Sequence, residues 1–182
     1  MNKKLKWGLI IVAVLGGGLY IAYLAMIAQT KSYSPEETVT YNLNGHNIEV
    51  FYNRPYKKER QIFGGLVPFG QVWRTGANEA TTFETSNDLN IGGQTLKAGK
   101  YTLWTIPEAD SWTIIFNDKQ YSWGVGPGGA SREAEYDALK AEATVGSLNQ
   151  VVEQFTIALE DAGGKPVLAF SWDQTKVSLP LD

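Results

Sequence analysis

Arginines are gathered in one part of this 182-residue chain. Three of its four arginines lie within 21 residues: Arg54, Arg60 and Arg74. A guanidinium group binds a carboxylate or a phosphate through a planar fork of N–H donors, and it also stacks on aromatic rings. The segment 54–76 has no sustained hydrophobic period and carries four glycines and two prolines, which predicts a long loop. Long loops inside compact domains are often functional.

Side chains suited to binding surround the last of these arginines. Trp73 precedes Arg74, and Asn78 and Glu79 follow it. We therefore predict that residues 54–79 form a binding surface for a small ligand, anionic or saccharide, or for a protein partner. Arg74 and Arg60 would hold an anionic group, Asn78 and Glu79 would orient it, and Trp73 would supply an apolar wall.

Two other interpretations of this segment remain open. In a structural one, Arg74 pairs with Glu79 or caps backbone carbonyls, the loop plugs the domain, and the protein is a structural module of the cell envelope. In a catalytic one, the protein is an envelope hydrolase in which Glu79 acts as acid or base and Arg74 stabilises developing negative charge. We favour the binding interpretation and predict no catalytic residue.

The composition excludes several other kinds of site. The absence of cysteine excludes disulfides, thiolate metal sites, a cysteine nucleophile and a lipid-modified cysteine. The single histidine, His46, excludes a multi-histidine metal cluster. The chain also lacks a phosphate-binding loop, a dinucleotide fingerprint and a Gly-x-Ser-x-Gly elbow. We predict no cofactor and no metal, and the net charge of -3 gives no reason to expect nucleic acid.

The N-terminal part of the chain has the composition of a membrane span. Residues 7–30 are uncharged and follow a tail, residues 1–6, that contains three lysines. As a helix this run would span about 36 Å, more than the roughly 30 Å hydrocarbon core of a bilayer. We predict a transmembrane signal-anchor helix; the alternative is a cleaved signal peptide, which would leave the remainder secreted. Met26 is bulky at the third position before a cut after Ala28, which favours the anchor.

Two further features of this region concern orientation and partners. The tail lysines place the N-terminus in the cytoplasm and the remainder of the chain outside the inner membrane. Ala13 lies four residues before Gly17, and Gly18 lies four residues before Ala22. Because such spacing lets two membrane helices approach closely, a homodimer through this helix is one interpretation.

The charge of the chain is divided between its two parts. Removing the three tail lysines from the 16 basic residues leaves 13, against 19 acidic residues, so the part from Lys31 onward has a balance of -6. An acidic body disfavours broad binding to nucleic acid or to anionic lipid.

After a polar linker at 31–37, the hydrophobic period is mostly two, which is typical of strands. Asn44-Gly45 and Gly92-Gly93 supply turn residues between consecutive strands. We therefore predict one extracytoplasmic domain, 38–182, folded as an all-β antiparallel β-sandwich of about nine strands. Segments with this pattern are 38–43, 47–53, 79–86, 89–91, 94–99, 100–107, 111–117, 153–160, 166–172 and 175–181.

Two local features are ambiguous. Residues 131–143 are good helix formers, yet their apolar residues alternate toward the end, which favours a strand from about Tyr136 with a helical turn before it. Trp104 is the tryptophan whose position in the core is least clear, because Leu103 and Ile106 differ in parity. We therefore include Trp104 in the candidate binding surface.

The chain resembles a bacterial envelope family, domain of unknown function 2911. The residues that carry the resemblance are FGGLVPFGQVWRTGANEAT (63–81), LKAGKYTLWTIP (96–107), SWTIIFN (111–117) and WG (123–124). The resemblance covers about residues 38–181 and implies an extracytoplasmic β-rich protein with a strand after Trp123, but no established activity, substrate or catalytic residue. The chain departs from the family at Lys140, where an arginine is usual, and in the glycine-rich residues 126–131, which look like an added loop.

Overall fold

The computed structural model describes residues 2–43 and 45–182, and its chain forms two compact units, Met1–Tyr33 and Ser34–Asp182. The first unit is the helix α1 (Lys3–Tyr33), whose apolar side chains are exposed along its length. Its 31 residues would measure about 46 Å at the usual rise per residue. Among the described residues, α1 is the helix that is long and apolar enough to cross a membrane.

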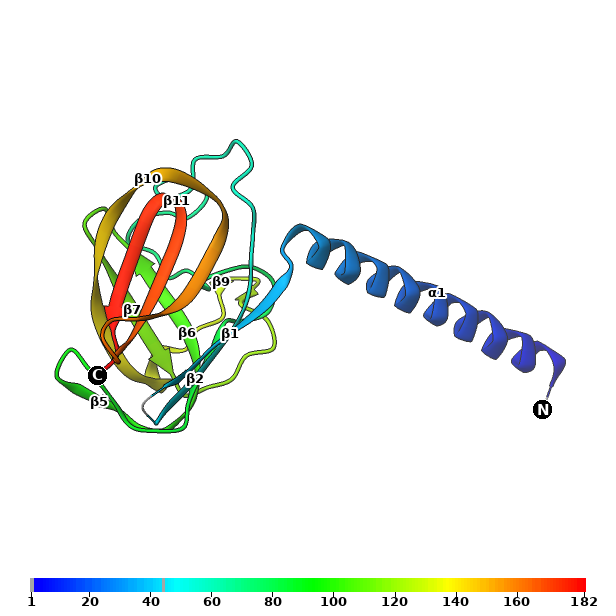
Figure 1. The fold of residues 1–182 in the computed structure, drawn as a ribbon. Coiled ribbons are helices and arrows are strands. Elements are labelled where there is room, and N and C mark those ends of the chain that lie inside the picture. The colour runs from blue at the N-terminus through cyan, green and yellow to red at the C-terminus, as the bar shows by residue number, and fades with distance from the viewer. Residues whose placement is uncertain (1, 44) are drawn as a thin grey trace. The chain divides into compact units, whose positions relative to one another are not determined.

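The second unit is built from strands, as predicted (Figure 1). Seven strands form one antiparallel sheet in the order β1-β2-β3-β6-β7-β10-β11, and β4-β5 and β8-β9 form two small hairpins. The bounds are β1 (Glu36–Leu43), β2 (His46–Asn53), β3 (Thr82–Thr85), β4 (Leu89–Ile91), β5 (Gln94–Leu96), β6 (Gly99–Pro107), β7 (Ser111–Asn117), β8 (Val125–Gly126), β9 (Gly129–Ala130), β10 (Asp137–Asp161) and β11 (Pro166–Pro180). The expectation of an all-β antiparallel fold preceded by one apolar helix is therefore confirmed.

The large sheet curls and nearly closes into a barrel, so the core is enclosed by a single sheet. The meeting point is a bridge between Tyr56, just after β2, and Gln154 of β10. Two backbone hydrogen bonds flank it, from Lys57 N to Glu153 O and from Phe155 N to Pro55 O at 2.9 Å. Curling removes most of the exposed sheet edge that an open sheet of this size would present.

Several boundaries differ from the prediction. The helix continues to Tyr33 and β1 begins at Glu36, so only Ser34 and Pro35 separate them where a linker of residues 31–37 was expected. The predicted turn at Asn44-Gly45 falls partly outside the described residues, because Asn44 is not among them.

The ambiguous segment contains both predicted elements. A single turn of 3-10 helix at Ala134–Tyr136 precedes β10. β10 is longer than expected, because the two predicted strands in this region, 136–145 and 153–160, are one continuous strand. Its pairing with β11 shifts register between Ser147 and Thr156, where the hairpin bends around the barrel (Figure 1). Hydrophobic alternation fades at such a bend, which explains why the sequence pattern breaks there.

Candidate functional site

The segment between β2 and β3, residues 54–81, closes one end of the barrel. Its Ile62 and Val67 are buried and belong to the same hydrophobic core as the inward side chains of the sheet. Backbone pairing also ties the segment to β6, because Trp73 and Thr105 exchange hydrogen bonds of 2.7 and 3.0 Å. Most of this predicted binding loop is therefore folded into the domain.

Trp73 does not face a ligand; it packs into the core. Its ring lies parallel to that of Trp172 at 6.0 Å between centroids, and edge-on to Trp112 and Phe155 at 6.0 and 4.9 Å. Phe63 from the same segment packs against it at 6.3 Å. The expectation that Trp73 forms the wall of an open site is not supported by these contacts.

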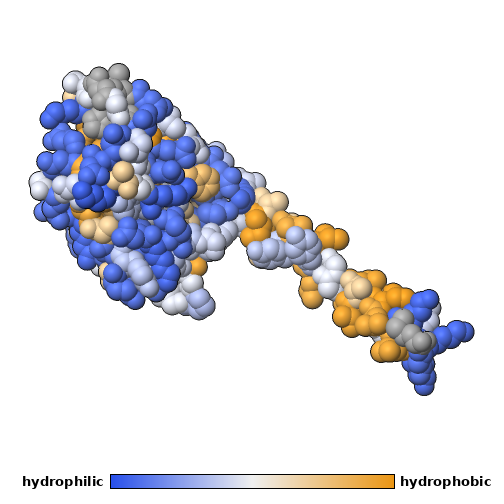
Figure 2. All heavy atoms as spheres, turned by 90° about the horizontal axis from the view of Figure 1, so that it is seen from below, coloured by the Kyte–Doolittle hydropathy of each residue, from blue (hydrophilic) through white to orange (hydrophobic). Residues whose placement is uncertain are grey.

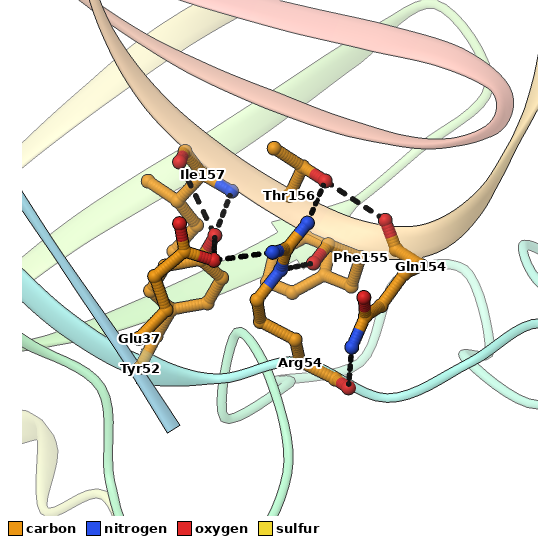
Figure 3. Close-up of polar contacts among 7 residues, drawn as sticks. All are labelled: Glu37, Tyr52, Arg54, Gln154, Phe155, Thr156 and Ile157. Carbon is orange, nitrogen blue, oxygen red and sulfur yellow. Dashed lines mark hydrogen bonds and ion pairs between the residues drawn. The ribbon is translucent and has the colours of Figure 1, made fainter. Parts of the chain in front are cut away.

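Arg54 lies in a closed network where β2 leaves the sheet (Figure 3). Its Nε donates to the carbonyl oxygen of Phe155 at 3.1 Å, and Nη2 donates to Oγ1 of Thr156 at 2.8 Å. Nη1 forms an ion pair with Oε2 of Glu37 at 2.5 Å. Each of the three guanidinium nitrogens therefore has a protein partner, and Arg54 joins β1, β2 and β10.

Tyr52 reinforces the same junction from inside the barrel (Figure 3). Its hydroxyl accepts a hydrogen bond from the backbone N–H of Ile157 at 2.9 Å and lies 3.3 Å from Oε2 of Glu37. The ring is fully buried and packs edge-on against Phe155. Burial raises the pKa of Tyr52 to about 12, so its hydroxyl stays protonated as this role requires.

Arg60 is exposed and holds its own loop together. Its Nε donates to the carbonyl oxygen of Lys57 at 3.0 Å, and Nη2 donates to that of Tyr56. These are capping interactions with backbone carbonyls, which the structural interpretation of the segment anticipated for an arginine.

Asn78 and Glu79 belong to a buried amide network instead of facing Arg74. Asn78 is buried and donates from Nδ2 to Oδ1 of Asn53 and to the carbonyl oxygen of Ser34, each at 3.4 Å. Nδ2 of Asn53 donates to Oε2 of Glu79 at 3.1 Å. Asn78 has a positive φ of 54°, which asparagine tolerates better than most residues. This network fixes the turn after Arg74.

Arg74 differs from the other two arginines of the segment. Side chains alternate along an extended chain, and Trp73 faces the core, so Arg74 faces the outside of the barrel. Its one hydrogen bond is from Nε to the carbonyl oxygen of Gly76 at 3.2 Å. Among the residues that the structure describes, no carboxylate pairs with its guanidinium. Its stem is half-buried, and burial lowers the pKa of Arg74.

Trp104, whose position was unclear from the sequence, lies on the same outer face and is fully buried. It precedes Thr105, the bridge partner of Trp73, so it is the sheet neighbour of Arg74. The ring of Tyr121 covers it edge-on at 5.5 Å between centroids. Its indole nitrogen has no hydrogen-bond partner among the described residues.

The loop that covers Trp104 also packs on Arg74. Gly124 lies so close to the arginine that a Cβ atom placed on it would be 2.7 Å from Cδ and 2.8 Å from Cβ of Arg74. The backbone N–H of Gly124 donates to the carbonyl oxygen of Asn78 at 3.0 Å. The loop 118–136 and the turn after Arg74 therefore form one packed layer on the outside of the sheet.

An acidic side chain anchors the far end of this loop. Asp137 accepts hydrogen bonds from Nδ2 of Asn117 and Nε of Arg132, each at 2.9 Å, and its side chain is 6% exposed. Burial by itself raises the pKa of Asp137, but the bonds to Arg132, Asn117 and Lys140 outweigh it and lower the pKa. Lys140 reaches the same carboxylate at 3.1 Å, so this lysine supplies a further ion pair to Asp137.

A separate surface depression lies elsewhere, over the outer faces of β1, β2 and β3. Its volume is about 260 Å³, and its lining includes Glu49 and Glu84, which sit directly opposite each other on adjacent strands. Lys100 pairs with Glu84 at 3.4 Å. No residue of the predicted binding surface lines this depression.

The six loop residues predicted as one site thus separate into different roles. Arg54, Trp73 and Asn78 stabilise the fold, Arg60 caps its loop and Glu79 joins the amide network. Arg74 packs against Gly124 of the loop 118–136, and Tyr121 of the same loop covers Trp104, the sheet neighbour of Arg74. The sequence signal for that loop is the aromatic-glycine composition of residues 121–131, which by itself indicates only a flexible connection.

Comparison with known proteins places the β unit in a family. A family model described as Protein of unknown function (DUF2911) matches residues 34–181. Comparison with curated proteins found no significant match, and comparison with solved structures found none either. The matched range covers most of the chain and includes every residue of the candidate site. The chain therefore belongs to the DUF2911 family.

Proposed function

We propose that this protein is a single-pass protein of the bacterial inner membrane that carries an extracytoplasmic β-barrel binding module. The observation that supports the proposal most strongly is α1, a helix with no charged side chain between Lys6 and Lys31. Figure 2 shows apolar side chains along this helix and a mainly hydrophilic surface on the visible face of the β unit. A long apolar helix that precedes a polar domain in the chain is the usual form of a membrane anchor.

The orientation follows from charge. Lys3, Lys4 and Lys6 precede the apolar run, and positive residues flanking a span favour the cytoplasmic side. The β unit, with its balance of -6, then lies outside the cytoplasm. The small residues of the span, Ala13 with Gly17 and Gly18 with Ala22, would lie in the contact between two helices if the protein dimerises through α1.

The binding part of the proposal depends on the outer face near Arg74. Arg74 is the arginine of the predicted surface whose guanidinium has a single hydrogen bond to the fold, from Nε to Gly76. A small ligand or a partner carrying an anionic group is the chemistry that such a side chain recognises. The hydrolase hypothesis receives no such support, because Glu79 is bonded to Asn53 in the network that fixes the turn.

The absence of cysteine allows a clean test of the topology. Single-cysteine variants Asn2→Cys and Asp110→Cys each carry one thiol, at exposed positions of the tail and the β unit. We expect a membrane-impermeant maleimide to label Asp110→Cys in intact bacterial spheroplasts, and Asn2→Cys only after permeabilisation. The cysteine-free parent is the control.

Two results would contradict the proposal. Labelling of the Asp110→Cys variant only after permeabilisation would place the β unit in the cytoplasm. Release of a shortened β unit from the membrane fraction, with the Asn2→Cys label lost, would show that α1 is a cleaved signal and that the mature protein is secreted.

A further inference from the structure

We infer that the outer-face layer around Arg74 is a binding site for the carboxylate group of a small, partly apolar ligand. The site consists of Arg74, Trp104, Tyr121 and Gly124, and it differs from the surface predicted from the sequence, which lay within one loop. The inference depends on the proposed function, because it names the class of ligand that the binding module takes.

The first step concerns the donors that Arg74 has available. The fold uses only Nε, which donates to Gly76. The side-chain atoms that are both fully buried and without a partner are the indole nitrogens of Trp104 and Trp172, among the residues that the structure describes. Nη1 and Nη2 of Arg74 are not in that group and form no hydrogen bond to the described residues, so neither nitrogen is fully buried. A half-buried arginine therefore presents an open fork of donors.

The second step concerns the charge of the ligand. No carboxylate of the described residues balances Arg74, so the layer has one uncompensated positive charge. The other cations of the loop 118–136, Lys119 and Arg132, are already paired with Glu133 and Asp137. The surrounding body is acidic, with its balance of -6. One planar carboxylate matches this single charge and the fork geometry, whereas a phosphate dianion would meet repulsion from the body.

The third step concerns the wall beside the fork. Trp104 is fully buried, and the half-buried ring of Tyr121 lies edge-on over it. Tyr121 thus covers the sheet neighbour of Arg74, and the accessible part of its ring is the aromatic surface that would favour a ligand with an apolar body over a fully hydrated one. The buried indole nitrogen of Trp104 is a donor without a partner in the same layer, and it makes a spectroscopic reporter of changes there.

Gly124 sets the position of the guanidinium. Because a Cβ atom at this position would overlap Cδ and Cβ of Arg74, any larger residue displaces the arginine stem. Gly124→Ala therefore disturbs the site without removing its charge. At Gly128, in the same loop, an added Cβ would meet no atom within 4 Å, so Gly128→Ala provides the matched control.

The experiment uses the full chain in zwitterionic detergent micelles, with benzoate as the probe. The six tryptophans give six indole N–H signals in a ¹H–¹⁵N spectrum, and Trp104→Phe identifies the signal of Trp104. At constant ionic strength we expect benzoate to shift this signal saturably, with acetate at least threefold weaker. Inorganic phosphate and chloride are expected to give no saturable shift.

Four variants separate the site from a general effect on the protein. Arg74→Lys keeps the positive charge but removes the planar guanidinium, and Gly124→Ala displaces the guanidinium of Arg74. Each variant is expected to weaken benzoate binding at least tenfold. Arg60→Lys and Gly128→Ala are expected to bind as the parent does. The thermal unfolding midpoint of each variant is measured in the same samples, so that a loss of binding is scored only in folded protein.

The outcomes distinguish this inference from the proposed function. Unchanged benzoate binding in folded Arg74→Lys, or phosphate binding as tight as benzoate, would overturn the carboxylate site. An absence of any benzoate shift would overturn it as well, and the topology from cysteine labelling would be unaffected. Saturable binding that needs both Arg74 and Gly124 would establish it.

Discussion

The guanidinium Nε of Arg54 donates a hydrogen bond to the carbonyl oxygen of Phe155, 101 positions further along the chain, at 3.1 Å. This contact lies where the sheet closes, beside the bridge between Tyr56 and Gln154. A side chain at the end of β2 therefore replaces part of the backbone ladder that a fully closed barrel would have. Arg54, one of the arginines of the predicted binding surface, thus stabilises the barrel where the sheet closes.

Replacing Arg54 should destabilise the β unit. Arg54→Gln removes the ion pair with Glu37 and shortens the side chain, which leaves the carbonyl oxygen of Phe155 without its partner. We expect a loss of about 2 kcal/mol in the free energy of unfolding, because hydrogen bonds to charged groups are stronger than neutral ones. Denaturant unfolding measures it. Arg60→Gln is the control and should change stability by less than about 0.5 kcal/mol, since Arg60 is exposed.

Tyr52 should contribute stability that depends on alkaline pH. Tyr52→Phe leaves the backbone N–H of Ile157 unpaired in the core, which should cost about 1–2 kcal/mol. The pKa of Tyr52 is raised to about 12 in the folded state, so its contribution is complete below pH 10 and is lost as the pH rises toward 12. The difference in unfolding free energy between parent and variant should therefore shrink over that range. A constant difference from pH 8 to pH 12 would contradict this account.

Asp137 should have the opposite pH dependence. Its pKa is lowered in the folded state, so its stabilisation is present above the pKa of the unfolded chain, about 4, and is lost as the pH falls through the folded value. Asp137→Asn leaves Arg132 facing a neutral group and should cost about 3 kcal/mol at pH 7. Urea unfolding at pH 7 and at pH 3 measures the change; a variant equally destabilised at both would refute the ionic role.

A charge in the middle of α1 should prevent stable membrane insertion. Leu15→Arg places a guanidinium near the centre of the apolar run, at a cost of about 3 kcal/mol. The fraction of protein that remains with membranes after alkaline carbonate extraction should fall. Leu5→Arg, which lies among the tail lysines, should leave the membrane-bound fraction unchanged.

Most of the fold could be predicted from the sequence, because local patterns specify strands and turns. The strand 111–117 and the strand 89–91 were predicted with the observed bounds. Closure of the sheet could not be predicted, because it depends on contacts such as Tyr52 with Ile157 between positions 105 residues apart. The long strand β10 was divided in the prediction, since its bend interrupts the alternation.

The candidate site was predicted less completely, for a physical reason. An arginine that binds a ligand and an arginine that closes a barrel look alike in a sequence, because both can have aromatic neighbours. What separates Arg54 from Arg74 is whether a carboxylate and carbonyls from distant strands reach the guanidinium. Gly124, which packs against Arg74, lies 50 positions away along the chain, and no local sequence pattern joins the two residues.

The central claim is that Arg54 stabilises the fold, whereas the guanidinium of Arg74 is available to bind a ligand. The thermal unfolding midpoints of Arg54→Lys and Arg74→Lys test it most directly, because both substitutions keep the charge and remove the planar fork. We expect Arg54→Lys to lower the midpoint by about 5 °C and Arg74→Lys to change it by less than about 1 °C. A large decrease for Arg74→Lys, with none for Arg54→Lys, would contradict the account.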